Sequence, residues 1–485
     1  MNILFIYSLQ EVQSIKKPIR MQIQLQLGIS LISSVLKKNK HDTQVAVISK
    51  VFKEKNKRTI DENINKFSPK LICYTATSCE YDFIKEIAGY VKASHPNIYS
   101  LIGGCHVSLN PEGVLSGPFD ALCIGEGEYP TLELASQLES GRKPSKIKNL
   151  WIKNDVGIEK NSTRPFVQDL DSLPFPDREI WQPWTNEQLG SKIPVLLGRG
   201  CPFECTYCCN DCLSKLAQGP YVRFRSPDNI LAEIKSIINK FPTIKEFRLE
   251  VESLGLNKDW AVELCSKLEG FNKTLNEPLS FESNLRIVPN SDFKDLFRAM
   301  KQANFKSINI GLESGSDKVR KKILKRIYKN EDVINTCSLA KKYGLSVGLF
   351  NMIGIPGETR EDYKKTVEIN RVCKPDYHYT SIFFPYPGTK LYSLCKEMGL
   401  IKGDLKTKME RKEALLDLPD FNRKQIKKSY VWFDYYVYKG YKPLYKILPK
   451  IFLNGISSNP SLYLFFRKIV HLPILKYIRL YYAKS

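Results

Sequence analysis

Short apolar runs alternate with amphipathic segments along the first 145 residues. Apolar runs bounded by turn-forming residues are typical of buried strands, and apolar positions three and four residues apart are typical of helices. The expected strands are Asn2–Tyr7, Thr43–Ile48, Leu71–Tyr74, Tyr99–Ile102 and Ala121–Ile124, and the expected helices include Ser30–Lys37 and Phe83–Lys92. The alternation predicts an α/β domain over residues 1–145, with a doubly wound, Rossmann-like, mostly parallel sheet between two layers of helices.

A second series of the same kind occupies residues 191–400. The expected strands are Ile193–Leu197, Glu246–Glu250, Leu279–Glu282, Ser307–Gly311, Ser346–Met352 and Tyr379–Phe383. The expected helices include Pro227–Asn239, Asp259–Leu268, Asp292–Gln302, Asp317–Ile323 and Glu331–Tyr343. Six such units predict a partial (β/α)6 barrel of the TIM type. In barrels of this kind, chemistry takes place on the loops at the C-terminal ends of the strands.

Two stretches interrupt the regular pattern. Residues 146–190 are rich in turn formers, as at Asp169–Arg178, and predict a connector. Residues 401–485 predict a mainly helical, basic region, with a charged helix expected at Lys402–Glu413. Its aromatic residues crowd one short part, namely Tyr430, Trp432, Phe433, Tyr435, Tyr436, Tyr438 and Tyr441. Such a cluster is more often local core, and with basic residues among it the cluster also suits a membrane surface.

Length and composition narrow the class of protein. A chain of 485 residues exceeds one ordinary core and predicts two or three domains. The sequence contains no run of about 20 apolar residues, so no membrane span is expected. The N-terminus predicts a first strand and no signal peptide, because it lacks a basic start and a cleavage site. Thirteen cysteines in such a chain favour a reducing cytoplasm over a disulfide framework.

Positive charge gathers near the C-terminal end of the chain. The net charge is +23, and Phe421–Ser485 holds 13 Lys and Arg against one acid, Asp434. This asymmetry is typical of a solvated basic tail. It also suits a patch for an acidic partner such as anionic lipid, nucleic acid or a phosphorylated substrate.

Three loops rich in small residues follow three strands of the first series. They are Thr75–Cys79, Gly103–His106 and Gly125–Glu128. All three are expected at the carboxyl edge of the sheet, where doubly wound folds bind ligands, and small residues there let a flat ligand approach the backbone. A dinucleotide site is not expected. No glycine-rich turn follows the first strand, and Pro130 stands where the third glycine of such a motif would be.

The most specific pattern is a cluster of cysteines that follows the strand Ile193–Leu197. Cys201, Cys205 and Cys208 have the spacing C-x3-C-x2-C. Three thiolates can hold three corners of a 4Fe–4S cluster and leave the fourth iron open for a ligand. A zinc site or a fully ligated ferredoxin-like cluster, built with the neighbouring Cys209 and Cys212, is the structural alternative. One loop carrying every ligand favours the open cluster, with Cys209 and Cys212 as non-ligands.

Four later segments strengthen this interpretation. In the cysteine spacing and in these segments the chain resembles the radical S-adenosylmethionine (SAM) superfamily. The segments are Leu249–Ser253, Ile310–Gly315, Met352–Thr359 and Phe384–Thr389. The resemblance implies that Cys201, Cys205 and Cys208 hold a 4Fe–4S cluster that binds and reductively cleaves SAM. The SAM-binding residues that it implies are Tyr207, Glu250, Glu313 and Gly354.

The first domain adds a second resemblance. Its three loops look like those of the cobalamin-binding domain that precedes the barrel in one large branch of that superfamily. The cobalamin-binding residues that this implies are Thr77, Ser78, Gly103, Gly104, His106, Gly125 and Glu126. The Asp-x-His-x-x-Gly signature that supplies a histidine to cobalt is absent. His106 is the only histidine in these loops, and a loop histidine bonded to backbone is favoured over a cobalt ligand.

Together, the two resemblances imply a cytoplasmic radical enzyme that uses a 4Fe–4S cluster, SAM and cobalamin. The commonest reaction of the branch is methyl transfer to an unactivated carbon. Ring closure, rearrangement or C–C bond formation without methyl transfer is the first alternative, and a cobalamin- or metal-responsive binding protein is the second. The expected partners are a small or lipid-like substrate and an external electron donor of the flavodoxin or ferredoxin type. Contact of the C-terminal region with the inner face of the membrane is also expected, whereas a nucleic acid is not.

Overall fold

The computed structural model describes residues 1–10, 17–21, 24–190, 192–252, 254–401, 403, 405, 410–459 and 462. The chain divides into two compact units. The first comprises Met1–Asn284, Arg298–Lys306 and Tyr386–Thr389. The second comprises Leu285–Phe297, Ser307–Pro385 and Lys390–Ser485.

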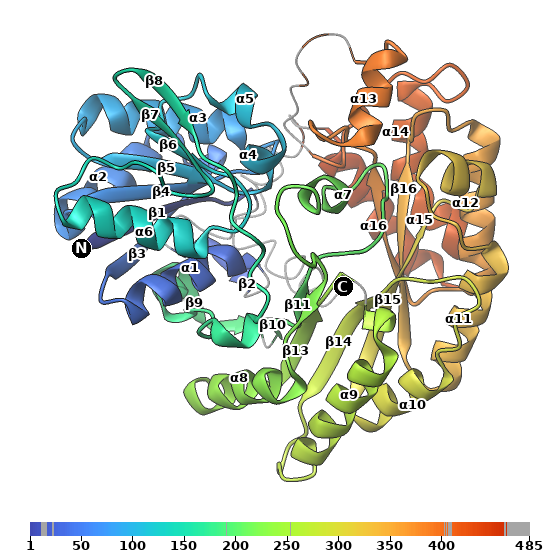
Figure 1. Cartoon of the computed structure of the whole chain (residues 1–485). Coiled ribbons are helices and arrows are strands. Elements are labelled where there is room, and N and C mark those ends of the chain that lie inside the picture. The colour runs from blue at the N-terminus through green and yellow to red at the C-terminus, as the bar shows by residue number, and fades with distance from the viewer. Residues whose placement is uncertain are drawn as a thin grey trace. The chain divides into compact units, whose positions relative to one another are not determined.

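A seven-stranded sheet forms the N-terminal part of the first unit (Figure 1), in the order β3-β1-β4-β5-β6-β7-β8. The strands are β1 (Asn2–Ser8), β3 (Asp42–Ile48), β4 (Leu71–Thr75), β5 (Tyr99–Gly103), β6 (Ala121–Cys123), β7 (Leu150–Asn154) and β8 (Gly157–Lys160). The five strands of the predicted domain are parallel, as expected. The antiparallel hairpin β7–β8 was not predicted, and it lies within the residues expected to form a connector.

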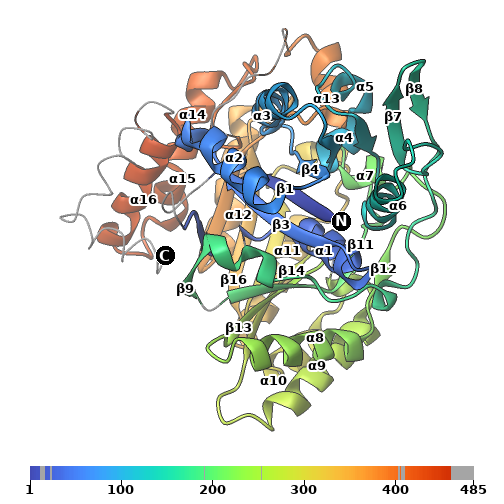
Figure 2. The ribbon, with the colours of Figure 1, turned by 90° about the vertical axis from the view of Figure 1, so that its left-hand side faces the viewer.

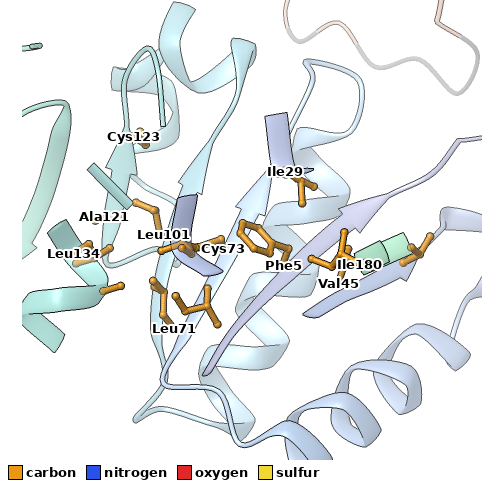
Figure 3. Packing of buried hydrophobic residues seen from close by; sticks show 14 of the residues in the cluster. Phe5, Ile29, Val45, Leu71, Cys73, Leu101, Ala121, Cys123, Leu134 and Ile180 are labelled. Carbon is orange, nitrogen blue, oxygen red and sulfur yellow. The ribbon is translucent and has the colours of Figure 1, made fainter. Parts of the chain in front are cut away.

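Helices cover both faces of this sheet, which explains the nearly continuous apolar runs of its strands. Helices α1 (Leu27–Lys38) and α6 (Glu128–Glu139) pack on one face, and α2 (Lys55–Phe67) and α3 (Tyr81–Ser94) pack on the other. Successive side chains of a strand point to opposite faces. Figure 3 shows side chains of β1, β3, β4 and β5 on the α1 and α6 face, among them Phe5, Val45, Cys73 and Leu101.

The first unit also contains the beginning of the second βα series. Strands β10 (Lys192–Leu196), β13 (Glu246–Glu250) and β14 (Ser280–Leu285) pair in parallel in that order. A short antiparallel ribbon of β11 (Gly198–Arg199) and β12 (Arg223–Phe224) leads into and out of the cysteine loop. The remaining elements here are β2 (Ile19–Met21), β9 (Thr185–Gly190), α4 (Cys105–Leu109), α5 (Pro111–Val114), α7 (Asn210–Leu213), α8 (Pro227–Lys240) and α9 (Lys258–Asn272).

The second unit continues the series with three more parallel strands, β15 (Phe305–Glu313), β16 (Ser346–Ile353) and β17 (Tyr377–Ile382). With the three strands of the first unit they confirm the six predicted barrel strands. The helices of this part are α10 (Lys294–Gln302), α11 (Asn330–Lys342), α12 (Arg360–Cys373), α13 (Lys390–Glu397), α14 (Arg423–Val431), α15 (Phe433–Tyr438) and α16 (Leu444–Ser457). The helix expected at Asp317–Ile323 is a π-helical turn over Val319–Ile323.

The last three helices pack together (Figure 2) and bury part of the aromatic cluster. The ring of Phe433 lies between Tyr363 of α12 and His378 of β17, with centroids 6.1 Å and 4.9 Å away. The expectation of a local core is therefore correct for Phe433, and it is also correct for the buried Tyr430 and Tyr438. The charged helix expected at Lys402–Glu413 does not form in its described part, where residues 410–413 are turn and bend. The rest of that segment lies largely outside the described residues.

The described residues contain no helix that combines the length and the apolar character needed to cross a bilayer.

Candidate functional site

A cavity of about 380 Å³ opens at the carboxyl edge of the seven-stranded sheet, on the face covered by α1 and α6. Its volume is typical of small-molecule and cofactor sites. Of the residues predicted to bind cobalamin, the cavity wall contains Thr77, Gly103, Gly104, Gly125 and Glu126. The structure therefore brings together residues from all three loops at the edge where the parallel strands end.

Glycine shapes the mouth of this cavity. Gly104 has a φ of +101°, which disfavours any residue with a side chain. A Cβ added there would lie 2.8 Å from Thr75 Oγ1 and 3.0 Å from the carbonyl oxygen of Ala76. Gly125, with a φ of +84°, makes the corresponding turn after β6. The loops thus present bare backbone to the cavity, as a large flat ligand requires, and the residues present fit cobalamin.

Ser78 and His106 lie outside the lining of the cavity. They bond to each other, with His106 Nδ1 3.0 Å from Ser78 Oγ. The buried imidazole stacks against Tyr81 of α3, with ring centroids 4.7 Å apart. Burial lowers the pKa of His106, which keeps the ring neutral at physiological pH. The ring is packed against the protein, but it bonds to the Ser78 hydroxyl where a backbone partner was expected. That His106 is not a cobalt ligand stays a prediction.

The carboxylate of Glu126 is engaged in ion pairs. Glu126 Oε1 lies 2.8 Å from Arg199 Nη1 and 3.0 Å from Arg223 Nη1. Its other oxygen accepts a hydrogen bond of 2.8 Å from the amide of Val167. Burial alone would raise the pKa of Glu126, but Arg199, the amide and Arg223 together lower it below its ordinary value. Glu126 therefore remains ionised and fixed in place. Arg199, which the sequence analysis did not single out, lies in the wall of the same cavity.

The cysteine loop begins two residues after Arg199. Cys205 is buried, and Cys201 and Cys208 are half-buried. Among the described residues no three His, Cys, Asp or Glu side chains are grouped closely enough to hold a single metal ion. A 4Fe–4S cluster makes a weaker demand, because each thiolate binds a different iron. Three thiols on one short loop therefore fit this cluster by the chemistry of the donor set.

The two neighbouring cysteines make contacts of their own. The thiol of Cys209 hydrogen-bonds with Cys105 and Cys208, which lowers the pKa of Cys105 to about 7 and that of Cys208 to about 6. Cys212 Sγ lies 2.9 Å from the carbonyl oxygen of Gly388 and donates to it. The contact between Cys105 and Cys209 joins the second loop of the cavity to the cluster loop. That Cys209 and Cys212 are not cluster ligands stays a prediction.

Two of the residues predicted to bind SAM belong to the first unit. Tyr207 lies in the cysteine loop. Glu250 ends β13, and its carbonyl oxygen accepts a hydrogen bond of 2.9 Å from Leu197, just before that loop. Arg248 Nε lies 2.7 Å from Glu250 Oε1. Burial raises the pKa of Glu250, while Arg248 counteracts the shift. The end of β13 thus lies beside the residues that precede the cluster loop, and a bound ammonium ion would favour the charged form of Glu250.

The other two predicted SAM-binding residues belong to the second unit. Glu313 is the last residue of β15 and has a φ of +58°, a conformation that is uncommon for a residue with a side chain. Arg326 Nη1 lies 2.7 Å from Glu313 Oε1 and holds the carboxylate. Gly311 leaves room for this pair, because a Cβ there would lie within 2.8 Å of Glu313 Oε1 and 2.9 Å of Arg326 Nη2. Arg326 was not predicted, since its charge alone does not reveal its partner.

Gly354 occupies a turn after β16 with a φ of +72°. The amides of Gly354 and Ile355 donate hydrogen bonds of 2.6 Å and 3.2 Å to Glu358 Oε2. Glu358 is buried, and burial raises its pKa to about 8 although the two amides lower it. A buried carboxyl group thus shapes the turn.

Two family models match the chain. Residues 22–135 match the B12 binding domain, and residues 195–369 match the radical SAM superfamily. The first match contains the loops of the cavity, and the second begins just before the cysteine loop. The chain is therefore a radical SAM enzyme that carries a cobalamin-binding domain, and its cofactors are a 4Fe–4S cluster, SAM and cobalamin.

Individual proteins agree with this class. An uncharacterised methyltransferase of Pyrococcus horikoshii is 28% identical over 89% of this chain and 90% of its own length. The cobalamin-dependent SAM radical enzyme OxsB, with aqua-cobalamin bound, has a TM-score of 0.69 at 15% identity, over 99% of this chain and 76% of its own. The radical SAM methyltransferase TsrM from Kitasatospora setae has a TM-score of 0.64 at 16% identity, over 83% of this chain and 77% of its own. The two structures share the predicted fold.

Replacement of Gly104 by alanine tests the cavity. The Cβ would collide with Thr75 and Ala76, so we expect Gly104→Ala to weaken the binding of hydroxocobalamin by at least about tenfold, measured by equilibrium dialysis. Gly141→Ala is the matched control, because Gly141 has a φ of +72° but no neighbour within 4 Å of an added Cβ. Equal affinities of the two variants would contradict this assignment of the cavity.

The buried Glu358 predicts a pH-dependent stability. Its pKa in the folded state is about 8 instead of 4.5, so its contribution is complete below about pH 4.5 and is lost as the pH rises through 8. Between about pH 4.5 and pH 8 the wild type should lose on the order of a few kcal/mol of its free energy of unfolding. We expect Glu358→Gln, which keeps an acceptor for both amides, to lack this loss. Thermal unfolding from acid to alkaline pH measures the effect. Glu361→Gln, at an exposed site on α12, should keep the wild-type profile.

Proposed function

We propose that this protein transfers a methyl group to an unactivated carbon of a small or lipid-like substrate. When bound, the cluster and SAM supply a carbon radical that removes a hydrogen atom from the substrate, and cobalamin supplies the methyl group. An external donor of the flavodoxin or ferredoxin type provides the electron. The chain's own contribution is to hold these groups in order and to keep water out.

One observation carries the proposal. The wall of the cavity contains Leu196 and Arg199, which lie directly before the cluster-binding loop. The cavity and the loop belong to one compact unit. A cofactor in the cavity therefore lies against the chain segment that positions the first cluster thiol, Cys201. Chemistry that uses both cofactors in a single turnover needs such proximity.

In this proposal the two acidic residues Glu250 and Glu313 accept hydrogen bonds from SAM. Glu250 accepts hydrogen bonds from the ammonium group of SAM, and Glu313 accepts them from its ribose hydroxyls. Arg248 and Arg326 each lie 2.7 Å from these carboxylates and orient them by charge, and Arg326 also donates a hydrogen bond to Glu313. Fixed acceptors bind without a further loss of side-chain entropy. The names of the relatives from Pyrococcus horikoshii and Kitasatospora setae support methyl transfer as the reaction.

The cysteines give the first test. We expect Cys201→Ala, Cys205→Ala and Cys208→Ala each to abolish the formation of deoxyadenosine from SAM, because two thiolates cannot hold the open cluster. Cys212→Ala, in the same loop, should retain both iron and cleavage. Iron content and product are measured after anaerobic reconstitution. Deoxyadenosine formed by any of the first three variants would contradict the assignment of the ligands.

The reaction itself is tested with SAM that carries a deuterated methyl group. We expect the deuterated methyl group in a methylated product, together with deoxyadenosine. Deoxyadenosine with an unmethylated, ring-closed or rearranged product would instead establish the alternative radical reaction. If cobalamin binds but neither a methylated nor a rearranged product forms, the interpretation as a cobalamin-binding protein is correct.

We also propose that the C-terminal helices contact an anionic membrane surface. On α16, Leu444, Tyr445, Leu448 and Phe452 expose 55%, 69%, 53% and 58% of their surface. Their helical spacing puts them on one face, while Ile447 and Ile451 are buried. Asp434 is the last acidic residue of the chain, and residues 463–485 add five Lys and Arg in sequence. An apolar stripe in a region whose sequence is strongly basic favours anionic lipid over a neutral partner.

Vesicle sedimentation tests this contact. We expect wild-type protein to sediment with phosphatidylglycerol vesicles but not with phosphatidylcholine vesicles, and to be released by salt. The double substitution Leu448→Glu and Phe452→Glu should abolish binding, because it puts charge into the apolar stripe. Val372→Glu, at a singly exposed valine on α12, is the matched control. Identical sedimentation of the double variant and the wild type would overturn the proposal.

A further inference from the structure

A buried ion network joins the cavity to the cluster loop in the first unit. Arg199 donates from Nη1 to Glu126 and from Nη2 to Glu128, and the two acids belong to the loop and first helical turn after β6. Arg223, the partner of Arg199 across the β11–β12 ribbon, also binds Glu126. Arg223 further donates to the carbonyl oxygen of Val167 at 2.7 Å. Two cationic side chains from the ribbon thus hold one acidic loop.

The link between Arg199 and the first cluster thiol is short and conformationally restricted. Only Gly200 separates Arg199 from Cys201, and its φ is +88°. A Cβ on Gly200 would lie 2.0 Å from the carbonyl oxygen of Tyr221, so the backbone is packed closely against the opposite strand. The backbone thus fixes Cys201 relative to Arg199, and a change in the anchoring of Arg199 acts only two residues from the first cluster thiol.

The other end of the network faces a ligand site with an unused acceptor. Glu128 is buried and belongs to the cavity wall. Its Oε1 binds Arg199, whereas Oε2 has no hydrogen-bond partner among the described residues. A buried carboxylate oxygen without a partner is costly, and a donor from a bound ligand removes that cost. The corrin ring of cobalamin carries amide side chains, whose N–H groups are donors of this kind.

We propose that Glu128 accepts a hydrogen bond from a corrin amide and that Arg199 is a positioning residue, which passes this contact on to the cluster loop. Binding at one cofactor site then changes affinity at the other, because both sites share Arg199. The inference rests on the proposed function only in taking the cavity as the cobalamin site. By linkage, the effect is reciprocal: the cluster strengthens cobalamin binding by the same factor as cobalamin strengthens cluster binding.

The experiment compares the affinity for hydroxocobalamin in the full-length protein with the cluster reconstituted and with the cluster removed by chelation. Equilibrium dialysis under anaerobic conditions gives both dissociation constants. In the wild type we expect the cluster to tighten binding by at least about fivefold. Arg199→Lys keeps the charge but lacks the planar guanidinium that reaches the two carboxylates from two separate nitrogens, so its ratio should fall towards one while both sites still load.

Matched variants separate coupling from folding. Arg178→Lys changes another buried arginine of the same unit, paired with Glu233 at 2.7 Å, and should keep the wild-type ratio. Glu128→Gln should weaken cobalamin binding about tenfold even without the cluster, because a charged acceptor becomes neutral. Glu133→Gln, at a more exposed acid of the same helix paired with Arg164, should not. If Arg199→Lys fails to fold, Glu128→Gln weakens the same link to Arg199, and its ratio decides the question.

The outcomes distinguish the two proposals. An unchanged ratio in Arg199→Lys, or in Glu128→Gln where it is needed, overturns the coupling. Wild-type affinity of Glu128→Gln overturns the amide contact. A wild type that binds hydroxocobalamin in neither state contradicts the cavity assignment itself, and with it the proposed function.

Discussion

The carboxylate of Glu126, shared by two arginines, is the interaction on which the arrangement of the first unit depends. It closes a buried network between the last of the three loops that line the cavity and the ribbon that leads into the cysteine loop. Burying charges is expensive, and the cost is recovered only when every partner is in place. The network therefore favours a single placement of the loop relative to the ribbon. A purely apolar contact would let the loop shift along the ribbon at little cost in free energy.

Parallel sheets make such a network possible. All strands of a parallel series end at the same edge, so loops far apart in sequence meet there without long connections. In the first unit this edge brings together the three loops rich in small residues and the residues that precede Cys201. The same rule operates in the second unit, where Glu313 and Gly354 follow the ends of β15 and β16.

Local patterns predicted the strands and helices well, because burial on both faces leaves a clear apolar signature. The cysteine spacing and the small-residue loops likewise pointed to the two cofactors. The partners of charged residues could not be predicted from the sequence. Arg199 and Glu126 are separated by 73 positions in sequence, and nothing local to either residue indicates their pairing. For the same reason Arg326 was missed, because its partner Glu313 lies 13 positions away. The hairpin β7–β8 was missed because its exposed second strand lacks an apolar face.

Gly200 has a consequence for how this part of the chain can vary. Loops between strands usually tolerate insertions, because added residues bulge into solvent. Between Arg199 and Cys201 the ion pairs anchor one end, and the cluster will anchor the other. One inserted residue would lengthen this link by about 3.5 Å, more than a hydrogen bond or a metal–sulfur bond can absorb. Homologues should therefore differ freely in the length of the loop after Cys208 but share the spacing Arg-Gly-Cys without gaps.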